Sequence, residues 1–400
     1  MSPLKGSGRL ALGTATIVNS ILTLSPQLLA LFVLIPSLFG MFSIVYLVYA
    51  FAVSLTLSFV SEPLIRSRVE PDKPRVWQGY ISALLSLAFV AGVVSALSAL
   101  MLGMQLGLAL VASVAVASSA VRSGVRFWQL HVNDWRKVML GDAHGVVGFW
   151  LAASICLATD ASALFTVIAS WMIAGVASLI SSFHSFVWSP RFTSEWVRRH
   201  STDIGLLLRD SILMDIGAIF TPLLLASSLS LSSFGTYRAV SNVASPVRLL
   251  LNPLRPYIGA SARSGGIRLS RVRWLTCTAG ILVGTLASLA LWSIDFLGFK
   301  MGVISSLATF IIPVGIFVGG NFVGHFFYIR SRISSNGKLL FVGRIIQTTL
   351  MTIGPILGVL FGGLSGAIWS LGLVTIISAC AWMLIDGASV KAFRTQEDTI

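Results

Sequence analysis

A stripe of polar and charged residues runs through one of the apolar segments of this chain. Its members lie 4, 3, 3, 4 and 3 residues apart, and are Arg238, Asn242, Ser245, Arg248, Asn252 and Arg255. These steps place the side chains on one face of a helix. Arginine supplies charge and paired hydrogen-bond donors, so the chemistry that this face offers is the recognition of an anion.

Two further apolar segments carry polar residues inside them. Asp215 lies near the middle of the preceding segment, and the first segment carries Thr16, Asn19, Thr23 and Gln27 at steps of 3, 4 and 4. Arginine facing lipid costs several kcal/mol, so such stripes must face a bundle interior or a water-filled cavity. The three stripes together predict one central cavity.

The direction of side chains predicts an ion pair within this set. Side chains on a helix lean toward its N-terminus. The segments that carry Asp215 and Arg248 run in opposite directions, so these two side chains lean toward each other. Arg238 and Arg255 lie closer to helix ends, where snorkelling to the lipid headgroups is a competing interpretation.

The elements that must position these residues are membrane-spanning helices. Of 400 residues, 56% are hydrophobic and only 10% are charged, against roughly 25% charged in soluble domains. The apolar residues form runs of about 20, the length that crosses a bilayer, and lack the alternation of barrel strands. The sequence predicts an all-α protein with about twelve spans. They are Leu10–Leu34, Phe39–Ser61, Tyr80–Met101, Leu102–Val121, Met139–Ala158, Ala163–Trp188, Ile204–Ser227, Phe234–Pro256, Trp274–Phe296, Val303–Tyr328, Leu339–Phe361 and Ser365–Ile385.

The basic residues indicate the orientation of these spans. All Lys and Arg residues except Arg238 and Lys300 lie in, or beside, every second segment between spans. Lysine and arginine mark the cytosolic side of a membrane protein, so both termini are predicted to be cytosolic. The net charge of +14 reflects this topology and attraction to anionic lipid headgroups, and nucleic acid is not an expected partner.

An internal repeat divides the predicted spans into two sets of six. Pro26, Leu28, Leu29 and Ala30, followed by Ser37 to Gly40, recur as Pro222, Leu224, Leu225 and Ala226, followed by Ser232 to Gly235. Six spans per copy leave both copies in the same orientation, so they are related by a pseudo-twofold axis along the membrane normal, as in many transporters. We expect an N-lobe over 1–190, a cytosolic linker over 191–203, a C-lobe over 204–388 and a cytosolic tail over 389–400.

No catalytic, cofactor or metal pattern accompanies the spans. The three cysteines, Cys156, Cys277 and Cys380, fall inside apolar runs and read as small core residues. The nearest approach to a metal pattern, which includes Asp142 and His144, does not follow a standard ligand spacing. Gly337-Lys338 lacks the remaining residues of a phosphate loop. We therefore expect neither an enzyme nor a cofactor.

The outer turns resemble those of a transporter family. Ser37-Leu-Phe-Gly-Met-Phe42, Ser233-Phe-Gly-Thr-Tyr-Arg238 and Gly363-Leu-Ser-Gly366-Ala-Ile-Trp369, with the two sets of six spans, are similar to Wzx-type flippases of lipid-linked oligosaccharides. These belong to the multidrug/oligosaccharidyl-lipid/polysaccharide exporter superfamily. The resemblance implies a bacterial plasma-membrane protein that moves a polyprenyl-pyrophosphate-linked glycan to the outer leaflet by alternating access, for surface polysaccharide assembly.

The resemblance also implies a basic substrate cavity and a set of partners. The arginine stripe corresponds to that cavity, with substrate-binding residues Arg238, Asn242, Arg248, Asn252, Arg255, Asp215, Asn19, Thr23 and Gln27. The first six spans lack deeply placed charges, which weights the predicted site toward the second lobe. Membrane lipids, and the glycan polymerase and ligase of the same pathway, are the expected partners of a monomeric protein.

Two alternatives remain open from the sequence. A cation-coupled multidrug exporter of the same superfamily needs a carboxylate inside the membrane, and only Asp215 qualifies. A membrane glycosyltransferase, polymerase or ligase needs an acidic residue at the outer face, where Asp160 and Asp295 are isolated.

Overall fold

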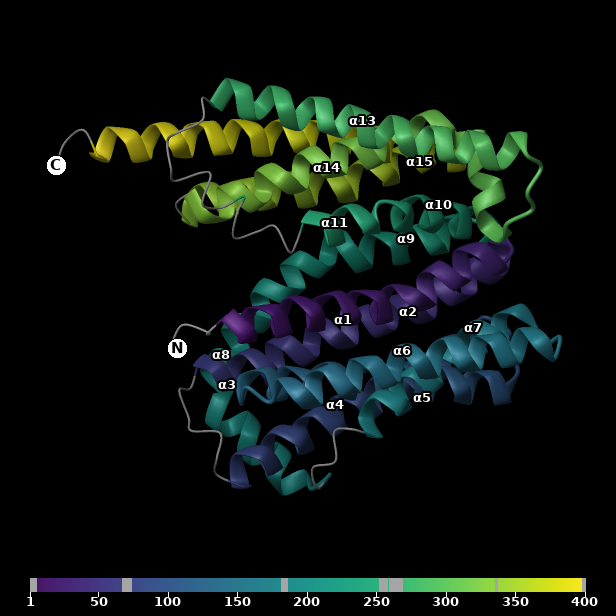
Figure 1. The fold of residues 1–400 in the computed structure, drawn as a ribbon, viewed down its shortest axis with the longest axis vertical. Coiled ribbons are helices and arrows are strands. Elements are labelled where there is room, and N and C mark those ends of the chain that lie inside the picture. The colour runs from purple at the N-terminus through teal and green to yellow at the C-terminus, as the bar shows by residue number, and fades with distance from the viewer. Residues whose placement is uncertain are drawn as a thin grey trace. The chain divides into compact units, whose positions relative to one another are not determined.

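The architecture is helical throughout. The computed structural model describes residues 6–66, 74–180, 186–251, 258, 269–334 and 337–397. Within these ranges there is no β-strand, which confirms the all-α class (Figure 1).

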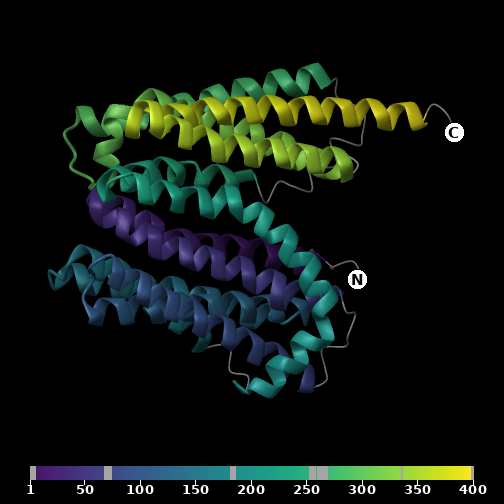
Figure 2. The ribbon, with the colours of Figure 1, turned by 180° about the vertical axis from the view of Figure 1, so that it is seen from behind.

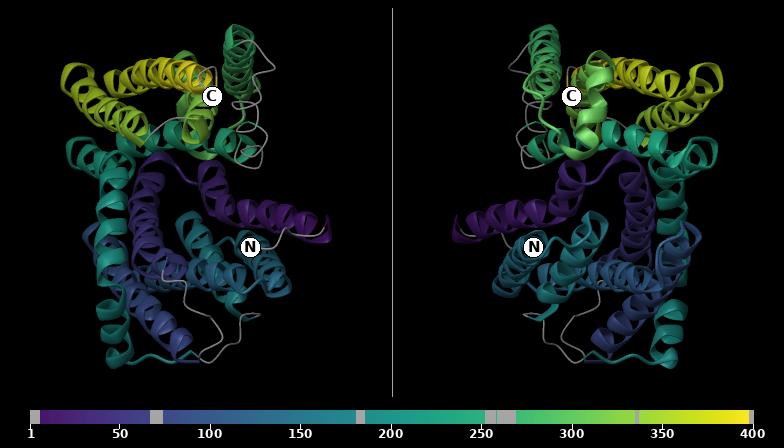
Figure 3. Two further views of the ribbon diagram at one scale, coloured as in Figure 1. Left: turned by 90° about the vertical axis from the view of Figure 1, so that its left-hand side faces the viewer. Right: turned by 90° about the vertical axis from the view of Figure 1, so that its right-hand side faces the viewer.

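The chain forms two compact units. The first consists of Met1–Leu34 and Met41–Ile219, and the second of Ile35–Gly40 and Phe220–Ile400. The sequence analysis expected the lobes to be joined over 191–203, and these residues form the first part of a long helix, α8. Figure 3 shows the helices of each unit more nearly end-on.

The helices follow one another with short connections. From the N-terminus to the end of α8 they are α1 (Gly6–Val33), α2 (Pro36–Thr56), the π-helix η1 (Leu57–Ser61), α3 (Glu62–Arg66), α4 (Pro74–Met101), α5 (Leu106–His131), α6 (Trp135–Ala158), α7 (Ala163–Ile180) and α8 (Pro190–Asp215). Then come the π-helix η2 (Ile216–Phe220), α9 (Thr221–Ser228), α10 (Leu231–Val243), α11 (Ser245–Leu251), α13 (Leu269–Phe296), the 3-10 helix η3 (Gly302–Phe310), α14 (Ile311–Ser334) and α15 (Gly337–Glu397).

Many of these helices can cross a membrane. In the part of the chain that the structure describes, nine segments are long and apolar enough. The last of them, Lys338–Ser389, contains two helices, because the backbone leaves the helical conformation at Gly362 and Gly363. Large apolar side chains such as Phe89 and Ile281 are 72% exposed, as expected for surfaces that face lipid. The count of twelve and the cytosolic termini stay predictions.

The hairpin between α5 and α6 corrects two predicted boundaries. The predicted spans ended at Val121 and restarted at Met139, whereas α5 continues to His131 and α6 begins at Trp135. The reversal is confined to three residues, with Asn133 at a φ of 60°, a left-handed conformation that asparagine tolerates well. The Asp134 side chain then caps α6 by accepting a hydrogen bond from the Lys137 backbone N–H. Arg122 and Arg126 therefore lie inside a helix rather than in a loop.

Both π-helices lie just before a proline. A proline cannot donate to the carbonyl four residues earlier, so the regular pattern must change there. Pro63 lies shortly after η1 and cannot donate a backbone hydrogen bond to the Phe59 carbonyl. That carbonyl instead accepts a hydrogen bond from Trp196 Nε1 at 3.2 Å. Pro222 follows η2 in the same way. The Trp196 contact joins α8 to η1, and Figure 2 shows α8 (teal) running along the first unit.

The N-terminal part of α8 is anchored by aromatic packing. Trp196 is buried and contacts Tyr80 edge-on, with ring centroids 5.7 Å apart. His200 lies on Trp196, with centroids 4.1 Å apart, and is itself buried. Burial lowers the pKa of His200, so the imidazole is neutral at pH 7. These contacts set the position of the residues at the other end of α8.

The two copies of the repeat start helices that touch each other. Ser37 to Gly40 lie in the first turns of α2, and Ser232 to Gly235 in the first turns of α10. A Cβ atom on Gly40 would overlap the Leu231 carbonyl, and one on Gly235 would overlap the Pro36 carbonyl. Glycine is needed at both positions because the two backbones meet there.

The predicted orientation can be tested by chemical labelling. Single cysteines at Ser37, Ser233 or Ser365 are expected to react with a membrane-impermeant thiol reagent applied outside the cell, after the native cysteines have been replaced. Cysteines at Ser67, Ser194 or Ser334 are expected to react only after the membrane is opened. Labelling of the two sets from the opposite sides would contradict the predicted orientation. A labelling pattern that requires an odd number of spans would contradict the twelve-span topology.

Candidate functional site

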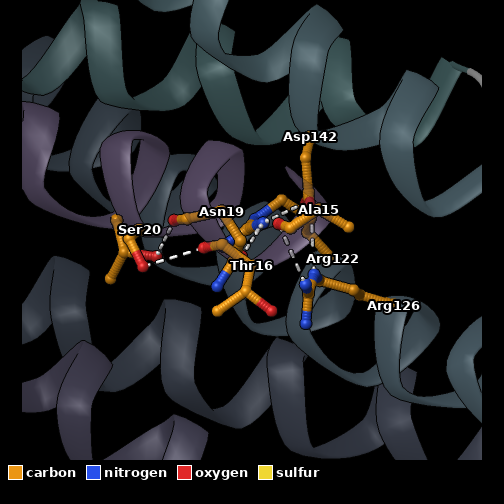
Figure 4. Close-up of polar contacts among 8 residues, drawn as sticks. Ala15, Thr16, Asn19, Ser20, Arg122, Arg126 and Asp142 are labelled. Atoms are coloured by element: carbon orange, nitrogen blue, oxygen red, sulfur yellow. Dashed lines mark hydrogen bonds and ion pairs between the residues drawn. The ribbon is translucent and has the colours of Figure 1, made fainter. Parts of the chain in front are cut away.

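A buried cluster of charged residues occupies the first unit (Figure 4). Asp142 on α6 is 2% exposed. Its Oδ1 accepts a hydrogen bond from Arg122 Nη1 at 3.1 Å, and its Oδ2 accepts one from Arg126 Nε at 2.9 Å. Both arginines come from α5 and lie one helical turn apart. One carboxylate therefore bridges two guanidinium groups.

Helix α1 completes this cluster. Asn19 Oδ1 accepts a hydrogen bond from Arg122 Nη1 at 3.1 Å, and the Ala15 carbonyl accepts one from Arg126 Nη2 at 3.4 Å. Asn19 was predicted as a substrate-binding residue, and its described partner is a protein side chain. Among the other predicted residues of α1, Thr23 donates to the Asn19 carbonyl at 2.8 Å, and Gln27 is half-buried.

The cluster shows that charged residues are also buried within the first unit. Arg122 lies nine residues before the end of α5, or about 13 Å along the helix axis, and Asp142 lies at a similar distance after the start of α6. An antiparallel hairpin brings such positions side by side. The sequence signal was present in the turn at Asn133-Asp134, but the charged residues beyond Val121 were interpreted as a loop.

The second unit contains a comparable buried carboxylate. Asp386 on α15 is fully buried, and both of its oxygens accept hydrogen bonds from Arg330 Nε on α14 at 3.2 Å. Arg273 on α13 donates to the Met383 carbonyl at 3.0 Å, one turn before Asp386. The surrounding core comes from the same three helices and consists of Val272, Phe327, Trp382 and Ile385. Each unit thus has its own buried acidic residue with arginine partners.

The predicted arginine stripe is only partly described. Arg238 and Asn242 lie one turn apart on α10 and are 8% and 9% exposed. The helix ends at Val243, and α11 starts at Ser245. Pro246 cannot donate a hydrogen bond to the Asn242 carbonyl, which the Ala244 N–H occupies instead. The helix that carries the predicted stripe is therefore interrupted at Ala244, and a shared face from Arg238 to Arg255 stays a prediction.

The remaining members of the stripe lie outside the described residues. The backbone of Arg248 belongs to α11, but its side chain is not among those described. Neither the backbone nor the side chain of Asn252 and Arg255 is among the described residues. Their roles, and the ion pair between Asp215 and Arg248, stay predictions.

Asp215 ends α8 directly before the π-helix η2. Its side chain is 8% exposed and lies near Ser54 of α2. The Oδ2 atom of Asp215 is buried without a hydrogen-bond partner. Among the buried carboxylates in the described part of the chain, this is the one without an ion pair.

Solved structures of membrane transporters resemble this arrangement of helices. An outward-facing multidrug resistance MATE family transporter of the MOP superfamily matches over 97% of both chains, with 14% identity and a TM-score of 0.55. The lipid II flippase MurJ, in an inward closed conformation, matches over 94% of this chain and 87% of its own, with 12% identity and a TM-score of 0.58. The chain has the fold of these transporters.

This fold, with the apolar helices, makes the chain a multi-pass membrane protein. No protein-family model and no curated protein sequence matches the chain. At 12–14% identity the likeness concerns the fold alone. Within the residues whose placement is described, no group of three or more His, Cys, Asp or Glu side chains is arranged to hold a metal ion.

Proposed function

We propose that the protein transfers a phosphate-bearing, lipid-linked oligosaccharide from the inner to the outer leaflet of a bacterial plasma membrane. The observation that carries this proposal is the burial of Arg238 and Asn242, which lie one turn apart on α10 and are 8% and 9% exposed. A guanidinium with an amide beside it offers several hydrogen-bond donors to an anionic group.

The pairing of the carboxylates supports the same choice. Asp142 and Asp386 are each held by arginine. A carboxylate in such a pair already has its charge compensated by arginine and is poorly suited to bind a coupling cation. A transporter of cations would need acidic side chains that remain available.

The proposed substrate contacts come from α10 and the residues after it. A pyrophosphate group carries its charge into a medium of low dielectric constant, where each uncompensated charge costs several kcal/mol. Arginine offsets this cost with paired, charge-assisted hydrogen bonds. We assign the headgroup contact to Arg238 and Arg248, with hydrogen bonds from Asn242 and Asn252 and support from Arg255, Asn19, Thr23 and Gln27.

Alternating access is the proposed mechanism. The lobes, 1–190 and 204–388, would rock around a central site, so that the headgroup is exposed to one side of the membrane at a time. The lipid tail would remain among membrane lipids. A glycan polymerase and a ligase would then act on the product at the outer face.

The test is translocation by purified protein in proteoliposomes. A fluorescent polyprenyl-pyrophosphate oligosaccharide is supplied, and its appearance in the other leaflet is followed by a membrane-impermeant quencher. Arg238→Ala and Arg248→Ala are each expected to slow transfer roughly 10- to 100-fold, since a hydrogen bond to a charged group contributes about 1.5–3 kcal/mol.

Arg191→Ala is the matched control, because that side chain is 83% exposed and lies in the predicted linker. It is expected to transfer substrate at the unmodified rate. Normal transfer by both Arg238→Ala and Arg248→Ala, at equal amounts of folded protein, would exclude the proposed headgroup contact.

A cation-coupled exporter is the second candidate, and Asp215 is the observation in its favour. A buried carboxylate without an ion pair is the kind of group that a proton or a sodium ion could neutralise. In the same proteoliposomes, export of a cationic dye that is driven by an ion gradient and lost in Asp215→Asn would favour this candidate. We expect no such export, and only a mild effect of Asp215→Asn on oligosaccharide transfer.

A further inference from the structure

A small polar cavity lies beside the charged cluster of the first unit. Its volume is about 10 Å³, enough for roughly one probe sphere the size of a water molecule. Helices α1, α2, α5 and α7 supply its walls. The side chains that matter here are Thr23, Tyr46, Tyr49, Ser119, Arg122 and Trp171.

Arg122 brings unused hydrogen-bond donors to this cavity. Its Nη1 atom donates to Asn19 and to Asp142, both at 3.1 Å. In the described part of the chain, the Nε and Nη2 atoms of Arg122 have no protein acceptor. Arg122 is 8% exposed as a whole and lines the cavity, so an acceptor for these donors would sit in the cavity.

The charge of the cluster is also incomplete. Arg122 and Arg126 carry two positive charges, and Asp142 carries one negative charge. No other carboxylate pairs with either arginine among the residues described. The described charges of the cluster therefore sum to +1, on side chains that are 10% exposed at Arg122 and 18% exposed at Arg126.

The other walls are suited to a small anion. The hydroxyl groups of Tyr49 and Ser119 have no described hydrogen-bond partner and line the same cavity. Trp171 contacts Tyr49 edge-on, with centroids 5.2 Å apart, and Tyr46 at 5.6 Å. This packing holds the walls in place. Aromatic edges carry partial positive charge, which also favours an anion.

We propose that this cavity binds one monatomic anion, chloride under physiological conditions. The anion would accept hydrogen bonds from Arg122 and from the hydroxyls of Tyr49 and Ser119, and would neutralise the cluster. The volume of the cavity is too small for a phosphate or a carboxylate group. The site lies within one unit, among α1, α2, α5 and α7, and the proposal does not depend on which substrate the protein transports.

The test measures halide binding to the purified full-length protein in lipid nanodiscs. Chloride or bromide is titrated against gluconate at constant ionic strength, and the unfolding temperature and chlorine NMR line width are followed. We expect a saturable rise in unfolding temperature with both halides, line broadening by chloride, and neither effect with gluconate. One anomalous scattering peak in a bromide-soaked crystal should lie beside Arg122.

Substitutions in the walls distinguish this site from general salt effects. Tyr49→Phe and Ser119→Ala each remove one donor and little volume, and each is expected to weaken halide binding roughly 10-fold. Arg122→Gln is expected to abolish it. Arg191→Gln, on the exposed surface, is expected to leave it unchanged.

Some outcomes would overturn the proposal. Equal effects of gluconate and chloride would show a general salt effect, and absence of saturation would show that the cavity holds only water. If Arg122→Gln does not fold, Tyr49→Phe and Ser119→Ala decide the question, and unchanged halide affinity in both would reject the site.

Discussion

Asp386→Ala is expected to prevent accumulation of the folded protein. Both oxygens of Asp386 accept hydrogen bonds from Arg330, and the two side chains are 0% and 3% exposed. Removing one partner of a buried pair costs about 3–5 kcal/mol, because the other charge is left without compensation. Proteins are typically stable by only about 5–15 kcal/mol. The yield of monodisperse protein after size-exclusion chromatography, and its unfolding temperature, measure the effect.

A double variant separates the charge from the packing. Arg330→Met combined with Asp386→Leu removes both charges and keeps apolar volume, so it is expected to recover much of the yield. The exposed pair Arg191 and Glu195 is the control, and Glu195→Ala is expected to change stability by less than about 1 kcal/mol. If Asp386→Ala unfolds at the same temperature as the unmodified protein, the pair does not stabilise the unit.

Gly235→Ala is expected to separate two helices that begin in contact. A Cβ atom there would overlap the Pro36 carbonyl and lie 2.9 Å from the Gly40 backbone nitrogen. Both neighbours are backbone atoms, which cannot rotate away as a side chain can. Overpacking of this kind costs about 1–3 kcal/mol or more. The unfolding temperature of the purified protein should fall clearly.

Gly107→Ala is the matched control, since a Cβ atom at that helical position meets nothing within 4 Å. Alanine is favoured over glycine inside a helix by up to about 1 kcal/mol, so this variant should unfold at the same or a higher temperature. Equal behaviour of Gly235→Ala and Gly107→Ala would show that the two repeat copies do not pack as described.

The charged clusters show that both units bury charged residues. The sequence analysis weighted the site toward the second lobe, whereas the first unit buries Arg122, Arg126 and Asp142 together. Asp142 is paired with arginine, whereas Asp215, in the same unit, has no ion pair among the described residues. A cation-coupled mechanism would therefore depend on Asp215.

Local sequence determined much of the architecture. Runs of apolar residues predicted an all-helical membrane protein, and the repeated Ser-x-Phe-Gly turns correctly marked related helix starts at α2 and α10. Gly358 and Gly366 meet backbone to backbone across the turn at Gly362 and Gly363, an approach that their lack of a side chain allows. These features follow from hydropathy and backbone freedom, which are properties of neighbouring residues along the chain.

Only the tertiary structure decided which buried charges are compensated. Arg122 and Asp142 are 20 residues apart, and Arg330 and Asp386 are 56 apart, so their pairing depends on which helices pack side by side. We interpreted Arg122, Arg126 and Arg330 as loop residues from the sequence. Basic residues indicate the cytosolic side of the membrane both when they lie in a loop and when they lie in the last turns of a helix, so the pattern does not distinguish the two cases. The free energy of burying a charge depends on which oppositely charged residue lies next to it in the folded protein. Hydropathy is calculated from neighbours along the chain, so it cannot predict that residue.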